Sequence, residues 1–271
     1  MSKLPIRTVE KPWGRDQLPA PFAGPLGAKI GEIWFEPPPE LPSLLVKYIF
    51  TSDNLSVQVH PNDEQARAAG HADRGGGGGK EECWLVIDAE PGAALGIGFH
   101  RAIDRDEMRA AALDGSIERL LVWHPVGPGD FFYIPANTVH AIGAGISLIE
   151  VQQNADITYR LYDYGRPREL HLDQAVDVAQ GEPHDPALRR HVPDRGTVEL
   201  ANGRYFTMHR LDGAPDAAVR EDYAGPLLVI PRAGDVRTRG EVIRAGECAC
   251  VGSIDELEFA SESRSLIVRP N

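Results

Sequence analysis

Residues 128–166 read PGDFFYIPANTVHAIGAGISLIEVQQNADITYRLYDYGR and contain three short apolar runs, at 130–134, 146–151 and 157–163. Each run is rich in β-branched and aromatic residues, and Gly, Pro, Asn or Asp residues lie between the runs. Short runs of this composition, separated by turn residues, are typical of β-strands. We therefore expect a mostly β protein built from short strands.

The sequence before this stretch follows the same pattern, with three more predicted strands at 44–51, 55–59 and 83–88. Helical segments interrupt the strands at Asp63–Ala69 and Asp104–Leu113. The second has acidic residues in its first turn and Gly115 after its end, as helices commonly do. A short helix over Ile117–Leu121 is expected to follow.

The composition changes after about residue 183. Two Pro-rich segments at 183–186 and 192–194 indicate a connector, and short alternating strands return from residue 196. We predict a first domain at 1–183, with a helical insertion at about 101–123, and a smaller β module at 184–271.

Charge and hydropathy exclude several classes of partner. The chain has 28 basic and 40 acidic side chains, a net charge of −12. An acidic protein lacks the basic face that binds nucleic acid or an anionic membrane surface. No run approaches the roughly 20 apolar residues of a membrane helix, and the N-terminus has no apolar secretory core. We expect a cytoplasmic protein.

The three cysteines are too few and too irregularly spaced for a disulfide framework. Cys248 and Cys250 alternate as residues on a strand do, and no further metal-ligand pattern lies near them. We interpret them as core thiols. His209 is isolated from other ligand types and is expected to be structural.

The first polar segment is Ser56-Val57-Gln58-Val59-His60-Pro61. Residues two apart on a strand share a face, so Ser56, Gln58 and His60 point one way and the valines point the other way. Such a strand lines a polar cavity or faces solvent. Pro61 ends it, which places His60 at its rim.

The second polar segment is Lys80-Glu81-Glu82-Cys83-Trp84. Lys80, Glu82 and Trp84 share one face, while Glu81 and Cys83 share the other. One interpretation is a surface ion pair at the start of a strand. The other is a pair of charged groups at a functional site.

The third polar segment contains His140, Glu150 and Arg160 at intervals of ten residues. Pro135 ends one strand, and a tight turn leads to His140 at the start of the next. Glu150 and Arg160 lie within apolar strands, where a buried charge is costly unless it is paired. They either pair with each other or face one polar cavity.

Two imidazoles and a carboxylate, His60, Glu82 and His140, are a ligand set that suits Zn²⁺. The amide oxygen of Gln58 can complete such a set. We therefore expect a metal centre that draws its ligands from three separate segments.

The run Gly75–Gly79 resembles a phosphate-binding loop only in its glycines. Lys80 is followed by Glu81 rather than by Ser or Thr, so the second half of that motif is missing. We expect a mobile hairpin loop.

In this order, the three segments resemble the type I mannose-6-phosphate isomerase family in its short bacterial form. The matching stretches cover most of residues 11–166 and lie at 11–14, 30–34, 44–66, 79–93 and 128–166. The combination of Ser-x-Gln-x-His-Pro, Lys-x-Glu and the His…Glu…Arg series is specific. The remainder of the chain shares only the general pattern of short strands with the family and none of these motifs.

The resemblance implies a cupin, which is a double-stranded β-helix barrel, with a second, smaller cupin-like module. It implies reversible isomerisation of mannose 6-phosphate and fructose 6-phosphate, with one Zn²⁺ per chain and a phosphorylated hexose as partner. The implied metal ligands are Gln58, His60, Glu82 and His140. The implied catalytic residues are Arg160, Glu150 and Lys80, and the implied substrate-binding residues are Ser56, Lys80, Asp156 and Arg160.

Two departures from the family concern the site. Asn137 stands in the turn where Gly is more common, and Asn tolerates the left-handed conformation. Glu81 adds a charge beside Lys80, whose pKa we expect a neighbouring metal cation to lower. The helical insertion is also limited to about 101–123, which is expected to leave the mouth of the barrel open.

Two other functions remain open from the sequence. One is another metal-dependent cupin enzyme, such as an oxygenase that holds iron at the same ligands. The other is a non-catalytic cupin that binds sugars or regulates. Lys80, Glu150 and Arg160 favour an enzyme, because a binding protein has no need of a buried acid and base around a metal.

Overall fold

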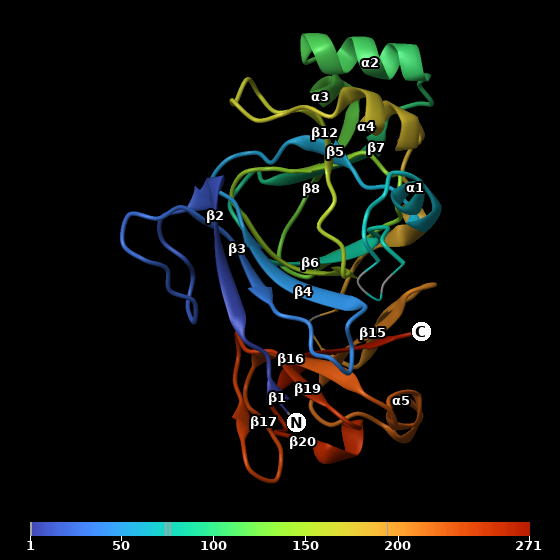
Figure 1. The fold of residues 1–271 in the computed structure, drawn as a ribbon. Helices are drawn as coiled ribbons and strands as arrows, with labels where there is room; N and C mark the ends of the chain where they lie inside the picture. The colour runs from blue at the N-terminus through green and yellow to red at the C-terminus, as the bar shows by residue number, and fades with distance from the viewer. Residues whose placement is uncertain (1, 74, 76, 194) are drawn as a thin grey trace.

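The computed structural model describes residues 2–73, 75, 77–193 and 195–271. Within these residues, a first body contains two antiparallel sheets. The larger sheet has the order β13-β9-β6-β11-β4-β3-β2, and the smaller has the order β12-β5-β10-β7-β8. Figure 1 shows the two sheets curving around a common interior.

The strands of the larger sheet are β2 (Ile6–Arg15), β3 (Ile30–Phe35), β4 (Leu44–Phe50), β6 (Glu82–Ala89), β9 (Asp130–Ile134), β11 (Ile146–Gln153) and β13 (Arg189–His191). Those of the smaller sheet are β5 (Val57–Val59), β7 (Ala94–Phe99), β8 (Leu121–Pro125), β10 (His140–Ile142) and β12 (Tyr159–Tyr162). The predicted strands and the mostly β class are confirmed.

Helices cover the outer face of the smaller sheet at the top of Figure 1. They are α2 (Arg105–Asp114), α3 (Ile117–Leu120) and α4 (Leu172–Val178), while α1 (Asp63–Ala68) lies beside β5. Val57 and Val59 of β5 are fully buried in one cluster with residues of α2 and α4. The valines of the Ser56–Pro61 segment therefore face the helices, as strand alternation predicted.

The C-terminal body lies below the first in Figure 1. Its main sheet has the order β1-β19-β16-β21-β15-β14, and a smaller sheet has the order β18-β17-β20. The main strands are β1 (Ser2–Lys3), β14 (Val198–Asn202), β15 (Phe206–Asp212), β16 (Leu227–Ala233), β19 (Ala249–Val251) and β21 (Arg264–Pro270). The rest are β17 (Val236–Arg237), β18 (Val242–Ile243), β20 (Glu258–Phe259), α5 (Ala217–Asp222) and the 3₁₀ turns η1 (Pro186–Leu188) and η2 (Ile254–Glu256).

The domain boundary near residue 183 stays a prediction. Two strands lie on one side of it in the sequence but pair with a strand of the body on the other side. The N-terminal strand β1 pairs with β19 of the C-terminal body, and β13 pairs with β9 of the first body. One hydrophobic cluster also joins the bodies, since Phe35 and Phe50 lie in it together with Met208 and Leu266.

The inner strands β3, β4 and β11 of the larger sheet are buried on both faces. Trp84 and Val86 of β6 lie in the cluster inside the barrel, whereas Cys83 and Leu85 lie in the cluster that faces the C-terminal body. Cys248 and Cys250 are buried free thiols in the second of these clusters, which confirms their predicted core role. None of the described helices is long and apolar enough to cross a membrane.

Candidate metal centre and active site

The three predicted metal ligands meet inside the barrel. His60 follows β5, Glu82 begins β6 and His140 begins β10. One ligand atom from each lies within 4.8 Å of the others, and all three side chains are buried. Segments 22 and 58 residues apart in sequence thus converge because β5 and β10 are neighbours in the smaller sheet, which faces β6 across the barrel.

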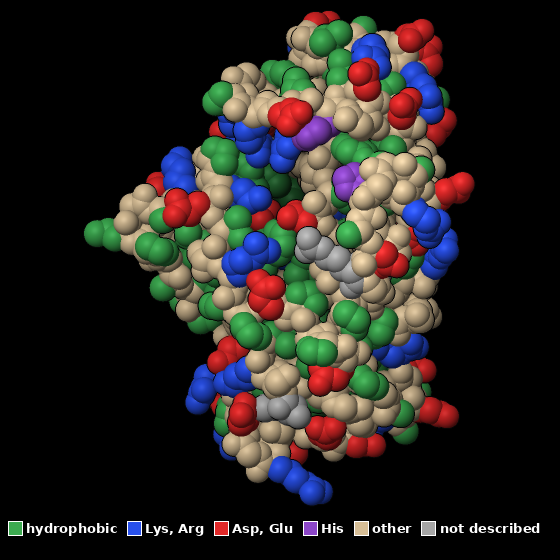
Figure 2. All heavy atoms as spheres, in the orientation of Figure 1, with side chains coloured by type: hydrophobic (Ala, Val, Ile, Leu, Met, Phe, Trp, Pro, Cys, Tyr) green, Lys and Arg blue, Asp and Glu red, His purple; other side chains and the backbone are tan. Residues whose placement is uncertain are grey.

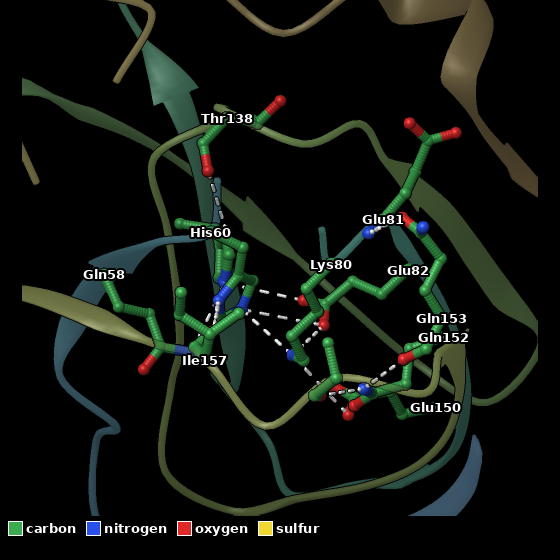
Figure 3. Close-up of polar contacts among 12 residues, drawn as sticks. Gln58, His60, Lys80, Glu81, Glu82, Thr138, Glu150, Gln152, Gln153 and Ile157 are labelled. Atoms are coloured by element: carbon green, nitrogen blue, oxygen red, sulfur yellow. Dashed lines mark hydrogen bonds and ion pairs between the residues drawn. The ribbon is translucent and has the colours of Figure 1, made fainter. Parts of the chain in front are cut away.

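Backbone carbonyl groups orient both imidazoles. The Nδ1 atom of His60 lies 2.7 Å from the carbonyl oxygen of Ile157, and Nδ1 of His140 lies 2.9 Å from that of Thr138 (Figure 3). Each Nδ1 must donate its proton to that carbonyl, which leaves Nε2 with a free lone pair. The two Nε2 atoms therefore have the form that ligates a metal.

The pKa values of the two imidazoles agree with this tautomer. Burial, followed by the positive charge of Lys80, lowers the pKa of His140 to about 3. The same two causes hold the pKa of His60 well below its ordinary value. Both side chains are therefore neutral near pH 7, as metal ligands must be.

Glu82 completes a donor set that fits a divalent cation. Its Oε1 atom is buried without a hydrogen-bond partner among the described residues and lies 3.5 Å from Nε2 of His140. Burial and the nearby charge of Glu150 raise the pKa of Glu82 to about 7. An unpaired buried carboxylate oxygen beside two unprotonated imidazole nitrogens is the chemistry of a His₂–carboxylate metal site.

Gln58 lies beside this donor set. Its register partner is His140, and its amide nitrogen is 3.3 Å from Nε2 of that residue. Its amide oxygen accepts a hydrogen bond of 3.1 Å from Ser56. Rotation of the amide by half a turn exchanges these two atoms and presents the oxygen to the centre.

Lys80 extends among the ligand atoms (Figure 3). Its Nζ atom is 3.0 Å from Nε2 of His60 and contacts Oε2 of Glu82. Both Lys80 and Glu82 are buried, so the alternative of a surface ion pair is wrong. Burial lowers the pKa of Lys80, but Glu150 and Glu82 raise it by more, so the net shift is upward. The predicted lowering assumed a neighbouring cation, whereas the groups that dominate here are carboxylates.

Glu150 pairs with Lys47 rather than with Arg160. Its Oε1 accepts a hydrogen bond of 3.0 Å from Lys47, and its Oε2 accepts one of 3.0 Å from the indole of Trp84. Burial raises the pKa of Glu150, yet Lys47 and Lys80 together lower it to about 2. Glu150 is therefore a fully hydrogen-bonded carboxylate.

The sequence reasoning missed Lys47, although a signal for it was present. Lys47 lies within the apolar strand β4, where a buried charge requires a partner just as Glu150 does. It is the direct cross-strand neighbour of Glu150. A search for opposite charges on two predicted strands gives Lys47, in addition to Arg160, as a candidate partner for Glu150.

Arg160 and Glu150 line one cavity, as the second alternative for them proposed. The Nε atom of Arg160 is buried without a partner among the described residues, and burial followed by Arg168 lowers its pKa. Figure 2 shows a hollow in this face of the first body, with basic side chains around it. Predicted residues in the lining are Ser56, Gln58, Lys80, Glu150, Asp156 and Arg160, and unpredicted ones include Lys11, Trp13, Glu32, Lys47 and Arg168.

Three other sequence expectations concern the surroundings of the centre. Asn137 has a φ of 72°, which confirms the left-handed turn, and its backbone N–H donates to the carbonyl of His60. Glu81 points away from the centre and accepts a hydrogen bond from Tyr133. Arg74 and Gly76, beside and within the glycine run, lie outside the described residues, and so does Asp194 of the connector.

Comparison with known proteins finds relatives of this chain by sequence. The mannose-6-phosphate isomerase ManA of Bacillus subtilis is 39% identical over 199 residues, which cover 69% of this chain and 60% of that protein. The mannose-6-phosphate isomerase of Streptococcus mutans is 45% identical over 196 residues, which cover 69% and 59%. The chain thus spans 59–60% of the length of these curated relatives. No protein-family model matches the chain.

Solved structures agree in fold. The crystal structure of mannose 6-phosphate isomerase from Bacillus subtilis superposes with a TM-score of 0.79 at 24% identity and covers 98% of each chain. A variant of phosphomannose isomerase from Salmonella typhimurium gives a TM-score of 0.70 at 15% identity, covering 99% of this chain and 98% of that one. The comparisons confirm the resemblance that the motifs indicated: this chain is related in sequence to mannose-6-phosphate isomerases and has their cupin fold.

Proposed function

We propose that this protein is a metal-dependent aldose–ketose isomerase that interconverts mannose 6-phosphate and fructose 6-phosphate, with one Zn²⁺ per chain. The main support is the convergence of two imidazole lone pairs and one unpaired carboxylate oxygen beside Lys80 and Glu150. The relatives named mannose-6-phosphate isomerase support the choice of substrate.

The metal would be held by His60, Glu82 and His140, with Gln58 as the fourth ligand. Zn²⁺ supplies Lewis-acid polarisation of a sugar carbonyl oxygen. Around it, the chain holds the ligands in place through the carbonyls of Ile157 and Thr138. Strict positioning of this kind lowers the reorganisation needed during the reaction.

Isomerisation moves one proton between C1 and C2 of the open-chain sugar through an enediol or enediolate. Glu150 and Lys80 are our candidates for this proton transfer, because both line the cavity beside the ligand cluster. Lys47 and Trp84 hold both oxygens of Glu150, so Glu150 would also fix the positions of Lys47 and Lys80. Arg160, as a permanent cation, would stabilise the negative charge of the enediolate.

The phosphate group would bind at the basic rim of the cavity. Arg160, Arg168, Ser56 and Asp156 line the cavity, and Asp156 would accept a hydrogen bond from a sugar hydroxyl. Paired guanidinium groups are well suited to a phosphate. We expect loss of Arg168 to raise KM for the phosphorylated sugar more than it lowers kcat, whereas loss of Arg160, which would also stabilise the enediolate, should lower kcat as well.

A coupled assay for fructose 6-phosphate formed from mannose 6-phosphate tests the proposal, with and without a chelator. We expect turnover that the chelator abolishes and that added Zn²⁺ restores. No isomerisation by a metal-loaded protein would contradict the proposal. Metal analysis then separates the alternatives: redox-active iron favours an oxygenase, and sugar binding without turnover favours a binding or regulatory cupin.

The roles of Glu150 and Lys80 are tested by Glu150→Gln and Lys80→Ala, with Glu81→Gln as a matched control that faces Tyr133 instead of the centre. We expect kcat to fall by about 10²–10⁴-fold in the variant that lacks the group transferring the proton. If both site variants keep the turnover of the control, neither residue has the proposed role.

A further inference from the structure

The short segment that presents Lys80 and Glu82 to the metal centre is fixed by three consecutive backbone N–H groups. That of Gly79 donates to Oδ1 of Asp63 at 3.1 Å. That of Lys80 donates to the carbonyl of Pro61 at 3.0 Å, and that of Glu81 donates to Oε1 of Gln153 at 2.9 Å. Two of these three acceptors are side chains.

Asp63 is one of those two acceptors and orients the other, Gln153. Its Oδ1 atom also accepts a hydrogen bond of 3.0 Å from Nε2 of Gln153, which fixes the amide so that its oxygen faces Glu81. Its Oδ2 atom accepts a hydrogen bond of 2.8 Å from the hydroxyl of Tyr205, which lies between β14 and β15 of the C-terminal body. One carboxylate thus connects α1, the segment before β6, the end of β11 and the C-terminal body.

The glycines before Lys80 permit this close approach. A Cβ atom on Gly79 would lie 2.5 Å from the backbone nitrogen of Asp63 and 2.6 Å from the carbonyl carbon of Asn62. A Cβ atom on Gly77, whose φ is +87°, would lie 2.5 Å from the Asp63 carboxylate. At Gly77 and Gly79, the backbone therefore lies so close to residues 62 and 63 that a side chain would not fit.

We propose that Asp63 is a positioning residue of the metal centre, and that Tyr205 is the contact through which the C-terminal body acts on it. The hydrogen bonds of the Asp63 carboxylate within the described residues go to Gly79, Gln153 and Tyr205, not to His60, Glu82 or His140. It acts on Glu82 and Lys80 by holding Gly79 directly and Glu81 through Gln153. The metal part of this inference requires a metal centre only, whereas the part on turnover rests on the proposed isomerase function.

The test measures Zn²⁺ affinity of the full-length chain by competition with a chromophoric chelator. The variants are Asp63→Ala, Tyr205→Phe and the double variant. Tyr223→Phe is the matched control, because its hydroxyl also belongs to the C-terminal body but bonds to the carbonyl of Thr207 at 3.2 Å, away from Asp63.

We expect Asp63→Ala to weaken Zn²⁺ binding by about 10–100-fold, the usual effect of losing a group that orients a ligand. Tyr205→Phe should weaken it less, Tyr223→Phe should leave it unchanged, and the double variant should match Asp63→Ala because Tyr205 acts through Asp63. In the isomerase assay, kcat should fall with little change in KM.

Wild-type Zn²⁺ affinity in folded Asp63→Ala would overturn the proposal. Circular dichroism checks that the variant folds, because Asp63 is the first residue of α1 and its replacement can destabilise that helix. If Asp63→Ala does not fold, the comparison of the two tyrosine variants decides: equal Zn²⁺ affinities overturn the proposal. If the wild-type protein binds Zn²⁺ but has no isomerase activity, the proposed function fails while the affinities still judge the role of Asp63.

Discussion

At the residue scale, the centre depends on which nitrogen of each imidazole has the proton. The carbonyls of Ile157 and Thr138 hold Nδ1 of His60 and His140, so both Nε2 atoms present lone pairs to the same point. Glu82 faces that point with an oxygen that has no other partner among the described residues. Buried acceptors of this kind are costly unless a donor or a cation lies between them, and Nζ of Lys80 lies 3.0 Å from Nε2 of His60 and contacts Oε2 of Glu82.

His140→Ala removes one of these ligands, and we expect it to lose Zn²⁺ and isomerase activity together. Metal content after dialysis and the coupled assay measure the two effects. His209→Ala is the control, because His209 is also a buried strand histidine but bonds to Tyr223 in the C-terminal body. A His140→Ala protein that turns over without metal would contradict the assigned centre.

Stability of the chelator-treated protein should depend on pH through the same residue. The pKa of His140 is about 3 in the folded protein, against about 6.5 in an unfolded chain. Between these values the unfolded chain binds a proton that the folded one does not, so the free energy of unfolding falls as the pH drops through this window. Urea titrations at about pH 7, 5 and 4 should show a steeper loss for the wild type than for His140→Gln.

The opposite sign applies to Glu82, whose pKa is raised to about 7. The folded protein there binds the extra proton, so this contribution to stability is lost as the pH rises through about 7. Glu82 is present in both proteins, and comparison with His140→Gln therefore isolates the histidine. Parallel pH profiles for the two proteins would refute the predicted effect.

At the scale of elements, the alternation of side chains along a strand separates the polar residues that face the site from the apolar residues that pack in the core. In β5 the valines pack against α2 and α4, while Gln58 faces the cavity with the flanking Ser56. In β6 the alternation sends Glu82 to the centre and Cys83 to the cluster shared with the C-terminal body. A shift of one residue in either strand would exchange the two sets.

The turn between β9 and β10 keeps His60 and His140 in place relative to each other. Asn137 has a φ of 72°, its N–H donates to the carbonyl of His60 at 2.8 Å, and its side chain donates to Gln65 at 2.6 Å. We expect Asn137→Ala to lower the free energy of unfolding more than Asn137→Gly does, by about 1 kcal/mol, because Gly adopts this conformation without strain. Urea unfolding measures the difference, and equal values would show that the turn imposes no strain.

At the scale of the whole molecule, the two bodies share a core. Phe35, Tyr48 and Phe50 of the first body pack in one cluster with Met208 and Leu266 of the second. The N-terminal strand β1 and the contact of Asp63 with Tyr205 add further connections. Bodies joined by a continuous buried cluster are expected to unfold together.

Met208→Ala tests this connection, because Met208 is fully buried and its sulfur lies 3.7 Å from that of Cys83 in the other body. We expect a loss of about 2–5 kcal/mol in the free energy of unfolding. Tryptophan fluorescence reports on the first body, which contains all four tryptophans, and far-UV circular dichroism reports on both. Their urea transitions should coincide in wild type and variant; separate transitions would mean that the bodies unfold independently.

The order and type of most strands in the first body were predictable from composition, since β-branched runs between turn residues have few other structures available. The strands β2, β3, β7, β8 and β13 and the helix α4 were not predicted. Exposed polar residues obscure the pattern in β2, and glycines obscure it in β7. The candidate ligands His60, Glu82 and His140 were also predictable, because their residue types and strand positions are local properties of the chain.

The sequence by itself determined the β class, the faces of the polar strands and the three candidate ligands, because each depends on neighbours within a few residues. Only the tertiary structure decided that Glu150 pairs with Lys47 instead of Arg160, and that Asp63 reaches both Gly79 and Tyr205. These contacts join residues 16 to 142 positions apart. Which distant charges meet depends on strand order and register across the whole barrel, and no local pattern specifies that order.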